Sequence, residues 1–73
     1  MLNKYTAVFE QDDDWWIGYV EELPGANTQG ATLAEARVNL QEAIQLVVEA
    51  NRELARREFA DRPVLRESLL VAV

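Results

Sequence analysis

The chain has 73 residues and a formal net charge of −6 at neutral pH, and it contains neither cysteine nor histidine. This length predicts a single domain over residues 1–73, with a small core that is marginal without a partner. The missing side chains exclude disulfides, thiolate nucleophiles, cysteine or histidine metal sites and histidine-based acid–base catalysis. There is no signal-peptide pattern and no apolar run of roughly 18 residues, so we expect a soluble cytoplasmic protein.

The acidic excess lies in the N-terminal half. Residues 1–36 hold seven acids against one base, Lys4, whereas the remainder holds six acids and six bases. An acidic surface repels phosphate and attracts a basic protein. We therefore expect no direct contact with nucleic acid. The acids either recruit a basic protein partner or only keep a small protein in solution.

Three strands are predicted in the first 30 residues. Lys4–Glu10 is rich in aromatic and β-branched residues, which favour a strand. The aspartates of residues 11–14 predict a turn, because a calcium loop needs alternating ligands and a glycine. Trp15–Glu21 pairs back as the second strand and is ended by Pro24. Asn27–Gln29 adds a short third strand to an antiparallel meander.

A long helix and a closing strand are predicted next. Thr32 and Glu35 have the spacing of a capping box. Apolar residues at spacings of three and four predict a helix from Leu33 to Glu58. Pro63 cannot continue it, and Val64–Val73 predicts a fourth strand beside the first, in the order 3-2-1-4. The expected fold class is α+β, a two-layer βββαβ arrangement with one covering helix.

The strands carry apolar side chains on both of their faces. One helix covers only one face of a sheet, so the other face of a free-standing monomer should be polar. In the second strand, Trp15 and Tyr19 point to the side opposite Trp16. An uncovered apolar face marks an interface. We therefore expect a homo-oligomer, a dimer or tetramer, with these three aromatic residues as interface candidates, or a binding surface for another protein.

No constellation of residues points to catalysis. Glu21 and Glu22 are neighbours on a strand, so their carboxylates point to opposite sides. There is no glycine-rich phosphate loop, and the single serine, Ser68, has no histidine to activate it. We expect a protein that is not an enzyme and that uses no cofactor and no metal.

The stretch from Trp16 to Ala36 carries several short motifs in order. The segment YVEELPG follows Trp16, a polar segment ends in a glycine, and TLAEA opens the helix. This combination resembles the HicB antitoxin family in its short form, which has only the N-terminal domain. Many members have a cysteine where this chain has Ala26. The signature positions that build the scaffold are Leu23, Pro24, Gly25, Gly30, Thr32 and Glu35.

The resemblance implies a fold and a role. The implied fold has a three-stranded meander, one helix and a fourth strand, like a ribonuclease H fold reduced in size and without its active site. The implied role is to bind and mask a small basic HicA-type toxin that cleaves mRNA. The expected toxin contacts are the acidic residues Glu10, Asp12, Asp13, Asp14, Glu21 and Glu22.

Many HicB antitoxins continue into a DNA-binding domain, and we expect none here, so operator binding is not carried over.

Two other interpretations of the sequence stay open. The chain is either an antitoxin or an orphan homo-oligomer that binds another protein or a small ligand. A degenerate nuclease with residual activity is the third interpretation.

Overall fold

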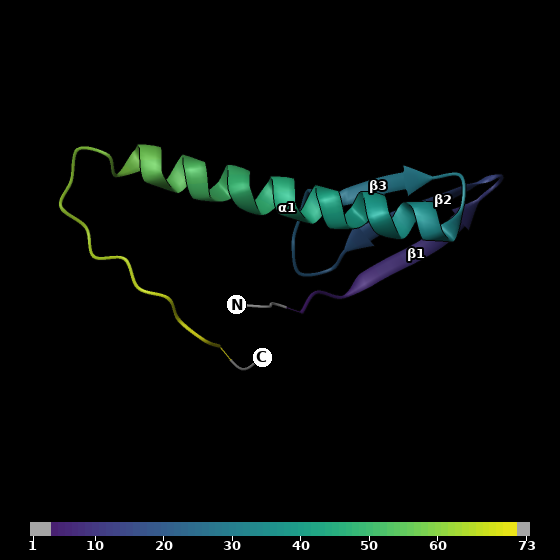
Figure 1. Cartoon of the computed structure of the whole chain (residues 1–73), viewed down its shortest axis with the longest axis horizontal. Helices are drawn as coiled ribbons and strands as arrows, with labels where there is room; N and C mark the ends of the chain where they lie inside the picture. The colour runs from purple at the N-terminus through teal and green to yellow at the C-terminus, as the bar shows by residue number, and fades with distance from the viewer. Residues whose placement is uncertain (1–3, 72–73) are drawn as a thin grey trace.

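In the computed structural model, residues 4–71 are described and form a three-stranded antiparallel sheet with one long helix across one face (Figure 1). The strands are β1 (Ala7–Asp12), β2 (Trp15–Val20) and β3 (Asn27–Gly30), and the helix is α1 (Leu33–Glu58). The strand order is β1-β2-β3, and both pairs are antiparallel. The α+β class, the meander and the bounds of the helix are confirmed.

The hairpin between β1 and β2 is tighter than predicted. Asp12 pairs with Trp15, so the turn consists of Asp13 and Asp14 alone. Asp13 has a φ of 53°, in the left-handed region that aspartate tolerates better than most residues. Because the turn is so short, the ladder continues through Gln11, which we had assigned to the turn. β1 therefore begins and ends later than predicted.

The turn between β3 and α1 brings two backbones into close contact. The Thr32 hydroxyl accepts a hydrogen bond from the Glu35 amide at 3.1 Å. Among residues 4–71, the Thr32 amide does not donate the reciprocal bond to the Glu35 carboxylate, so half of the predicted capping box is realised. At Gly30, a Cβ atom would lie 2.7 Å from the backbone nitrogen of Ala36. The helix can start this close to the strand because Gly30 has no side chain.

The core lies between the first half of α1 and the sheet. Its centre is formed by Val20, Ala26 and Leu40. Half-buried side chains complete it: Tyr5, Phe9, Leu23, Ile44 and Val47. The helix packs mainly on β3 and then on β2, so β1 is left largely uncovered.

The second half of α1 extends beyond the sheet (Figure 1). Every residue from 49 to 58 is exposed, and the predicted apolar stripe is covered only as far as Val48. Leu54, farther along the stripe, is 60% exposed. A helix of this length spans about 39 Å, whereas a six-residue strand spans about 20 Å. No helix within residues 4–71 is long and apolar enough to cross a membrane.

The predicted fourth strand at Val64–Val73 is not formed in the described residues. Residues 64–71, here called the C-terminal segment, have no strand pairing, and residues 72 and 73 lie outside the described range. The segment runs back along the helix as an extended chain (Figure 1). Because α1 ends well beyond the sheet, the C-terminal segment begins away from it and does not meet a strand edge. Leu65 and Leu70 remain more than four-fifths exposed.

The molecule is elongated. Its radius of gyration is 15.4 Å, whereas a compact chain of this length has about 11 Å. Its accessible surface is 6390 Å², whereas a folded monomer of this mass exposes about 4,600 Å². The chain therefore leaves about 1,800 Å² more surface in water than a self-contained domain would.

Replacing Gly30 by alanine is expected to destabilise the fold by about 1–3 kcal/mol, because the added methyl group overlaps the backbone at the start of α1. Urea unfolding followed by circular dichroism measures the change. The control is Ala31→Ser, at the neighbouring exposed position, which should shift stability by less than about 0.5 kcal/mol. Equal stability of the two variants would show that the contact is not tight.

Candidate functional site

Within residues 4–71, nothing covers the face of the sheet opposite α1, and large apolar side chains run along its centre. On β2, Trp15, Ile17 and Tyr19 share this face. Trp15 is 51% exposed and Tyr19 is 42% exposed. A contiguous aromatic and aliphatic row on an open sheet is a surface suited to binding a protein.

The outer strands border this row with polar side chains. On β1, Val8 lies opposite Tyr19, Glu10 opposite Ile17 and Asp12 opposite Trp15. On β3, two amide side chains occupy the equivalent positions. Together these residues form what we call the open face: Val8, Glu10, Asp12, Trp15, Ile17, Tyr19, Asn27 and Gln29. Its chemistry is an apolar centre with carboxylates along one side, which is complementary to a basic partner with an apolar contact point.

The six acids expected to contact a toxin separate into two groups. Glu10 and Asp12 lie on the open face, and the turn residues Asp13 and Asp14 follow directly. Glu21 and Glu22 follow the opposite end of β2, about 20 Å away along the strand. The first four acids form one surface, which we call the acidic tip. Within residues 4–71, no group of three or more acidic side chains is placed to hold a metal ion.

Glu22 has a structural partner. Its carboxylate accepts a hydrogen bond from the Thr6 hydroxyl at 2.7 Å and another from the Thr6 amide at 2.7 Å. The Glu21 amide donates to the Thr6 carbonyl at 3.1 Å. The hydroxyl bond, followed by the amide bond, lowers the pKa of Glu22 because both stabilise the ionised carboxylate. This carboxylate therefore closes the open end of the hairpin.

The three aromatic interface candidates do not share one face. Trp15 and Tyr19 lie on the open face, whereas Trp16 is half-buried on the side covered by α1, where it pairs with Gly30. The alternation of β2 predicted this separation. A single interface on the open face can therefore contain Trp15 and Tyr19, but not Trp16.

The family-signature residues form the turn between β2 and β3 and the start of the helix. The Leu23 side chain is half-buried against the core, and its carbonyl accepts from the Ala26 amide at 3.1 Å. Gly25 has a φ of 92°, which glycine adopts without strain. The Val20 amide donates to the Ala26 carbonyl at 3.1 Å. These positions, with Pro24 between Leu23 and Gly25, build the turn that connects β2 to β3.

A groove between β1 and α1 was not predicted. Its volume is about 380 Å³, and it is lined by Tyr5, Ala7, Phe9, Arg37, Leu40, Gln41 and Ile44. It exists because α1 packs on β2 and β3. A helix is about 10 Å wide and strands lie about 4.8 Å apart, so one helix covers about two strands. Three predicted strands and one helix therefore already indicate that one edge strand is left uncovered.

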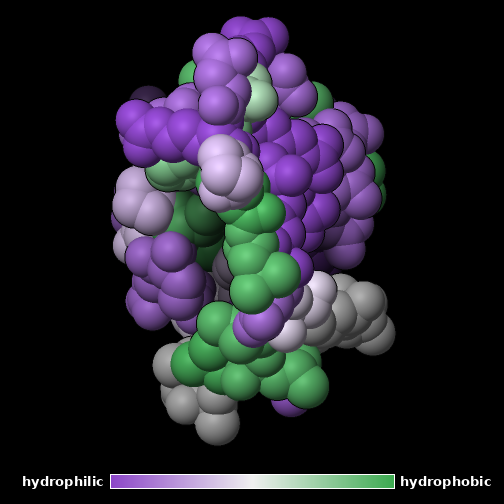
Figure 2. All heavy atoms as spheres, turned by 90° about the vertical axis from the view of Figure 1, so that its left-hand side faces the viewer, coloured by the Kyte–Doolittle hydropathy of each residue, from purple (hydrophilic) through white to green (hydrophobic). Residues whose placement is uncertain are grey.

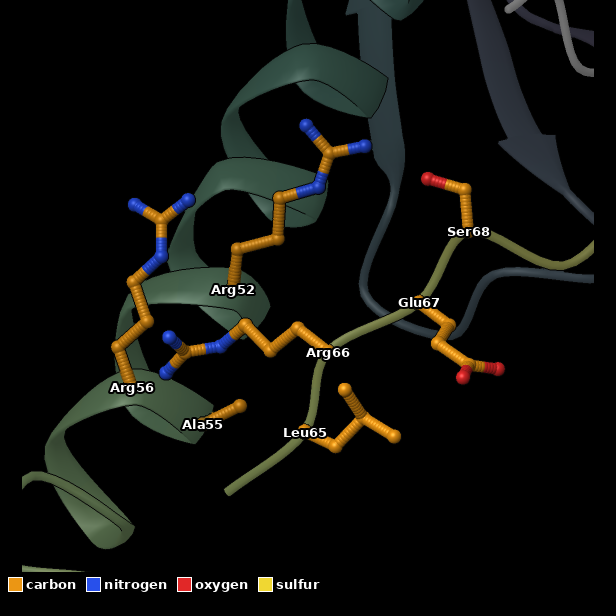
Figure 3. Close-up of a pocket in the computed structure, with 7 residues that line it drawn as sticks. All are labelled: Arg52, Ala55, Arg56, Leu65, Arg66, Glu67 and Ser68. Carbon is orange, nitrogen blue, oxygen red and sulfur yellow. The ribbon is translucent and has the colours of Figure 1, made fainter. Parts of the chain in front are cut away.

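A second hollow lies where the C-terminal segment passes the end of α1 (Figure 3). It has a volume of about 580 Å³, and three arginines line it: Arg52 and Arg56 from the helix and Arg66 from the segment. The Glu67 carboxylate points away from Arg56 and Arg66 (Figure 3). The neighbouring ion pair, Arg57 with Glu53 at 3.1 Å, lies within the helix. The hollow is shallow and dominated by like charges.

The chain is similar to a group of small proteins from bacteria and archaea. A UPF0150 protein of Synechocystis is 40% identical over 73 residues, which cover 97% of this chain and 99% of the relative. The chain belongs to the UPF0150 family. UPF0150 proteins of Thermotoga maritima and Thermoplasma acidophilum are 40% and 42% identical over 58 and 48 residues. These stretches cover 75% and 64% of this chain and 77% and 70% of the relatives.

The names of these UPF0150 relatives state no activity, ligand or partner. No family model matches the chain. No solved structure matches it either. The family is therefore shown by whole-chain similarity, and the function has to be argued from the surfaces of this UPF0150 protein.

The Thr6–Glu22 contact predicts a pH dependence of stability in this UPF0150 protein. The pKa of Glu22 is lowered on folding, so its contribution is fully present above the ordinary glutamate pKa of about 4.3 and is lost as pH falls through the lower folded pKa. When the pH is lowered from neutral to below about 4.3, Glu22→Gln should therefore lose less free energy of unfolding than the wild type. Urea midpoints across the pH series measure it.

The matched control for this pH series is Glu21→Gln, which removes a neighbouring exposed carboxylate that makes no side-chain bond to Thr6 among residues 4–71. Its pH profile should follow that of the wild type. If Glu22→Gln also follows the wild-type profile, the two hydrogen bonds do not stabilise the hairpin.

Proposed function

We propose that this protein is a non-catalytic binding protein of the HicB antitoxin kind, which binds and masks a small basic HicA-type toxin that cleaves mRNA. The observation that carries the proposal is the open face, where an exposed aromatic row lies beside carboxylates. A toxin that binds RNA presents positive charge, which the acidic tip attracts. The proposed place of action is the cytoplasm, where such a toxin meets mRNA.

The two parts of the surface have different tasks in this proposal. The acidic tip raises the rate of encounter and orients the toxin, since exposed charges act mainly on association. Trp15 and Tyr19 then supply the desolvated centre, since aromatic side chains dominate the binding energy of protein interfaces. Glu22 is already occupied by Thr6 and supports the hairpin.

The second candidate function is an orphan homo-oligomer that binds another protein or a small ligand. It is favoured by the large accessible surface, because about 1,800 Å² of excess surface is more than the roughly 800 Å² that each partner buries in a standard interface. The two candidates are compatible in one respect, because an antitoxin can also be an oligomer. They differ in whether a toxin is the ligand.

Co-expression tests the toxin proposal. We expect a small basic protein encoded beside this gene to arrest growth alone and to be neutralised by this chain. The variant Glu10→Gln/Asp13→Asn/Asp14→Asn should neutralise it poorly, because the steering charge is gone. The control Glu42→Gln/Glu49→Gln/Glu58→Gln removes the same number of exposed charges from α1 and should rescue growth like the wild type. The absence of any toxic neighbour, or equal rescue by both variants, would contradict the proposal.

The aromatic row is tested by affinity. Trp15→Ala should weaken binding of the purified toxin about 30-fold or more, since a truncated aromatic hot spot costs about 2 kcal/mol. Val38→Ala is the control, because it removes an exposed apolar side chain from α1. Calorimetric titration gives both dissociation constants. Similar dissociation constants for the two variants would show that the toxin does not bind the open face through Trp15.

A further inference from the structure

The outer edge of β1 is an unfilled position in the sheet. Within residues 4–71, β1 pairs with β2 on one side and has no partner strand on the other. The groove lined by Phe9, Leu40 and Ile44 runs beside this edge under the helix. An edge strand presents free amides and carbonyls that accept another strand. A strand placed here would complete the sheet and fill the groove with one row of its side chains.

The C-terminal segment has the composition of such a strand. Its Leu69, Leu70 and Val71 are each more than 70% exposed. Figure 2, which looks along the molecule from the end of α1, shows apolar side chains gathered on the side where this segment runs. A run of exposed aliphatic residues with strand propensity is unstable in water as a free chain. The segment therefore needs a partner surface.

The polarity of the two strands favours one direction of pairing. β1 is apolar at its start and acidic at its end, whereas the segment has Arg66 at its start and three aliphatic residues at its end. An antiparallel alignment with Arg66 opposite Asp12 places Leu69 opposite Phe9 and Val71 opposite Ala7. Because facing residues share one side of a sheet, Leu69 and Val71 enter the groove while Arg66 joins Asp12 on the open face.

A parallel alignment is less favourable. A parallel alignment that keeps the aliphatic residues together places Leu69 opposite Ala7. Arg66 then lies opposite Lys4, which has the same charge. It also leaves the acidic residues at the end of β1 opposite no residue of the segment within the described range. The antiparallel register, by contrast, matches residues 66–71 to all six residues of β1.

The chain's own segment has the wrong direction for this register. β1 and β3 run the same way, α1 runs back, and the segment returns in the direction of β1 (Figure 1). An antiparallel pairing in the same chain needs one more reversal. In its own chain, Arg66 also lies beside Arg52 and Arg56 (Figure 3), where like charges repel. A second copy related by a two-fold axis perpendicular to β1 offers its own β1 in the required direction.

We infer that two copies exchange their C-terminal segments, so that residues 66–71 of one copy form a fourth strand antiparallel to β1 of the other. Leu69 and Val71 fill the groove of the partner, and Arg66 pairs with the acidic tip. The exchange uses two identical contacts and accounts for the excess accessible surface of the single chain. It does not depend on the toxin proposal, because the row Trp15, Ile17 and Tyr19 stays free.

Cysteine pairing tests the exchange, since the chain has no cysteine of its own. The inferred register places Leu70 opposite Val8, within disulfide distance. Val8→Cys protein and Leu70→Cys protein are unfolded, mixed in equal amounts, refolded and oxidised. We expect the mixed disulfide dimer as the main product on a non-reducing gel. Leu65→Cys in place of Leu70→Cys, outside the register, should give little of it.

The double variant Val8→Cys/Leu70→Cys distinguishes exchange from pairing within one chain. Exchange predicts a covalent dimer, whereas a segment that pairs with its own β1 gives an oxidised monomer. The unmodified protein should be a dimer at about 10 µM by light scattering, within the usual range of stable interfaces. A monomer, an internal disulfide, or a dimer without the mixed disulfide overturns the inference.

Charge reversal gives an independent measurement that changes no buried residue. Arg66→Glu and Asp12→Arg should each weaken the dimer about fivefold or more, and the combined variant should recover most of the loss. Glu49→Arg with Arg52→Glu is the matched control, because both positions are exposed on α1 and lie outside the paired strands. Equal effects in the two sets would exclude the Arg66–Asp12 register.

Discussion

The close approach of α1 to the end of β3 determines where every other element lies. Gly30 lets the Ala36 backbone lie almost directly against the strand, and the Thr32 cap holds the first turn there. The Asn39 side chain adds a hydrogen bond to the Gln29 carbonyl at 3.1 Å. The helix is therefore tied to the β3 side of the sheet. Since one helix covers about two strands, the cost of this placement is an uncovered β1.

The same placement explains the length of the helix and its bare end. Only the turns that lie over the sheet bury apolar surface, through Ala36, Leu40 and their neighbours. Beyond Val48 the helix continues without a sheet beneath it, although its apolar pattern persists to Leu54. Among the described residues, nothing covers this part of the apolar stripe in the single chain. Local helix propensity alone does not require leucine at an exposed position.

Local patterns in the sequence were enough to predict the helix and the three strands of the meander. Features that depend on contacts between distant residues were not predicted. The cap at Thr32 and the stripe gave the helix bounds correctly, and alternation placed Trp15 and Trp16 on opposite faces. The end of β1 was wrong, because composition does not reveal a two-residue turn with Asp13 in the left-handed region. The task of Glu22 was missed, since its partner lies 16 residues away. The predicted fourth strand is not formed in the described residues of the single chain, because a strand needs an edge within reach.

The two ends of the molecule differ in charge, and this has a consequence for recognition. The acidic tip lies at the hairpin end, whereas the arginines line the hollow near the end of α1. If the β1 edge and groove are filled by a second copy, Asp12 is neutralised by Arg66, and Glu10, Asp13 and Asp14 are left beside the aromatic row. Assembly then removes the apolar edge that any strand could occupy, and leaves the open face as the surface on which a basic partner is selected.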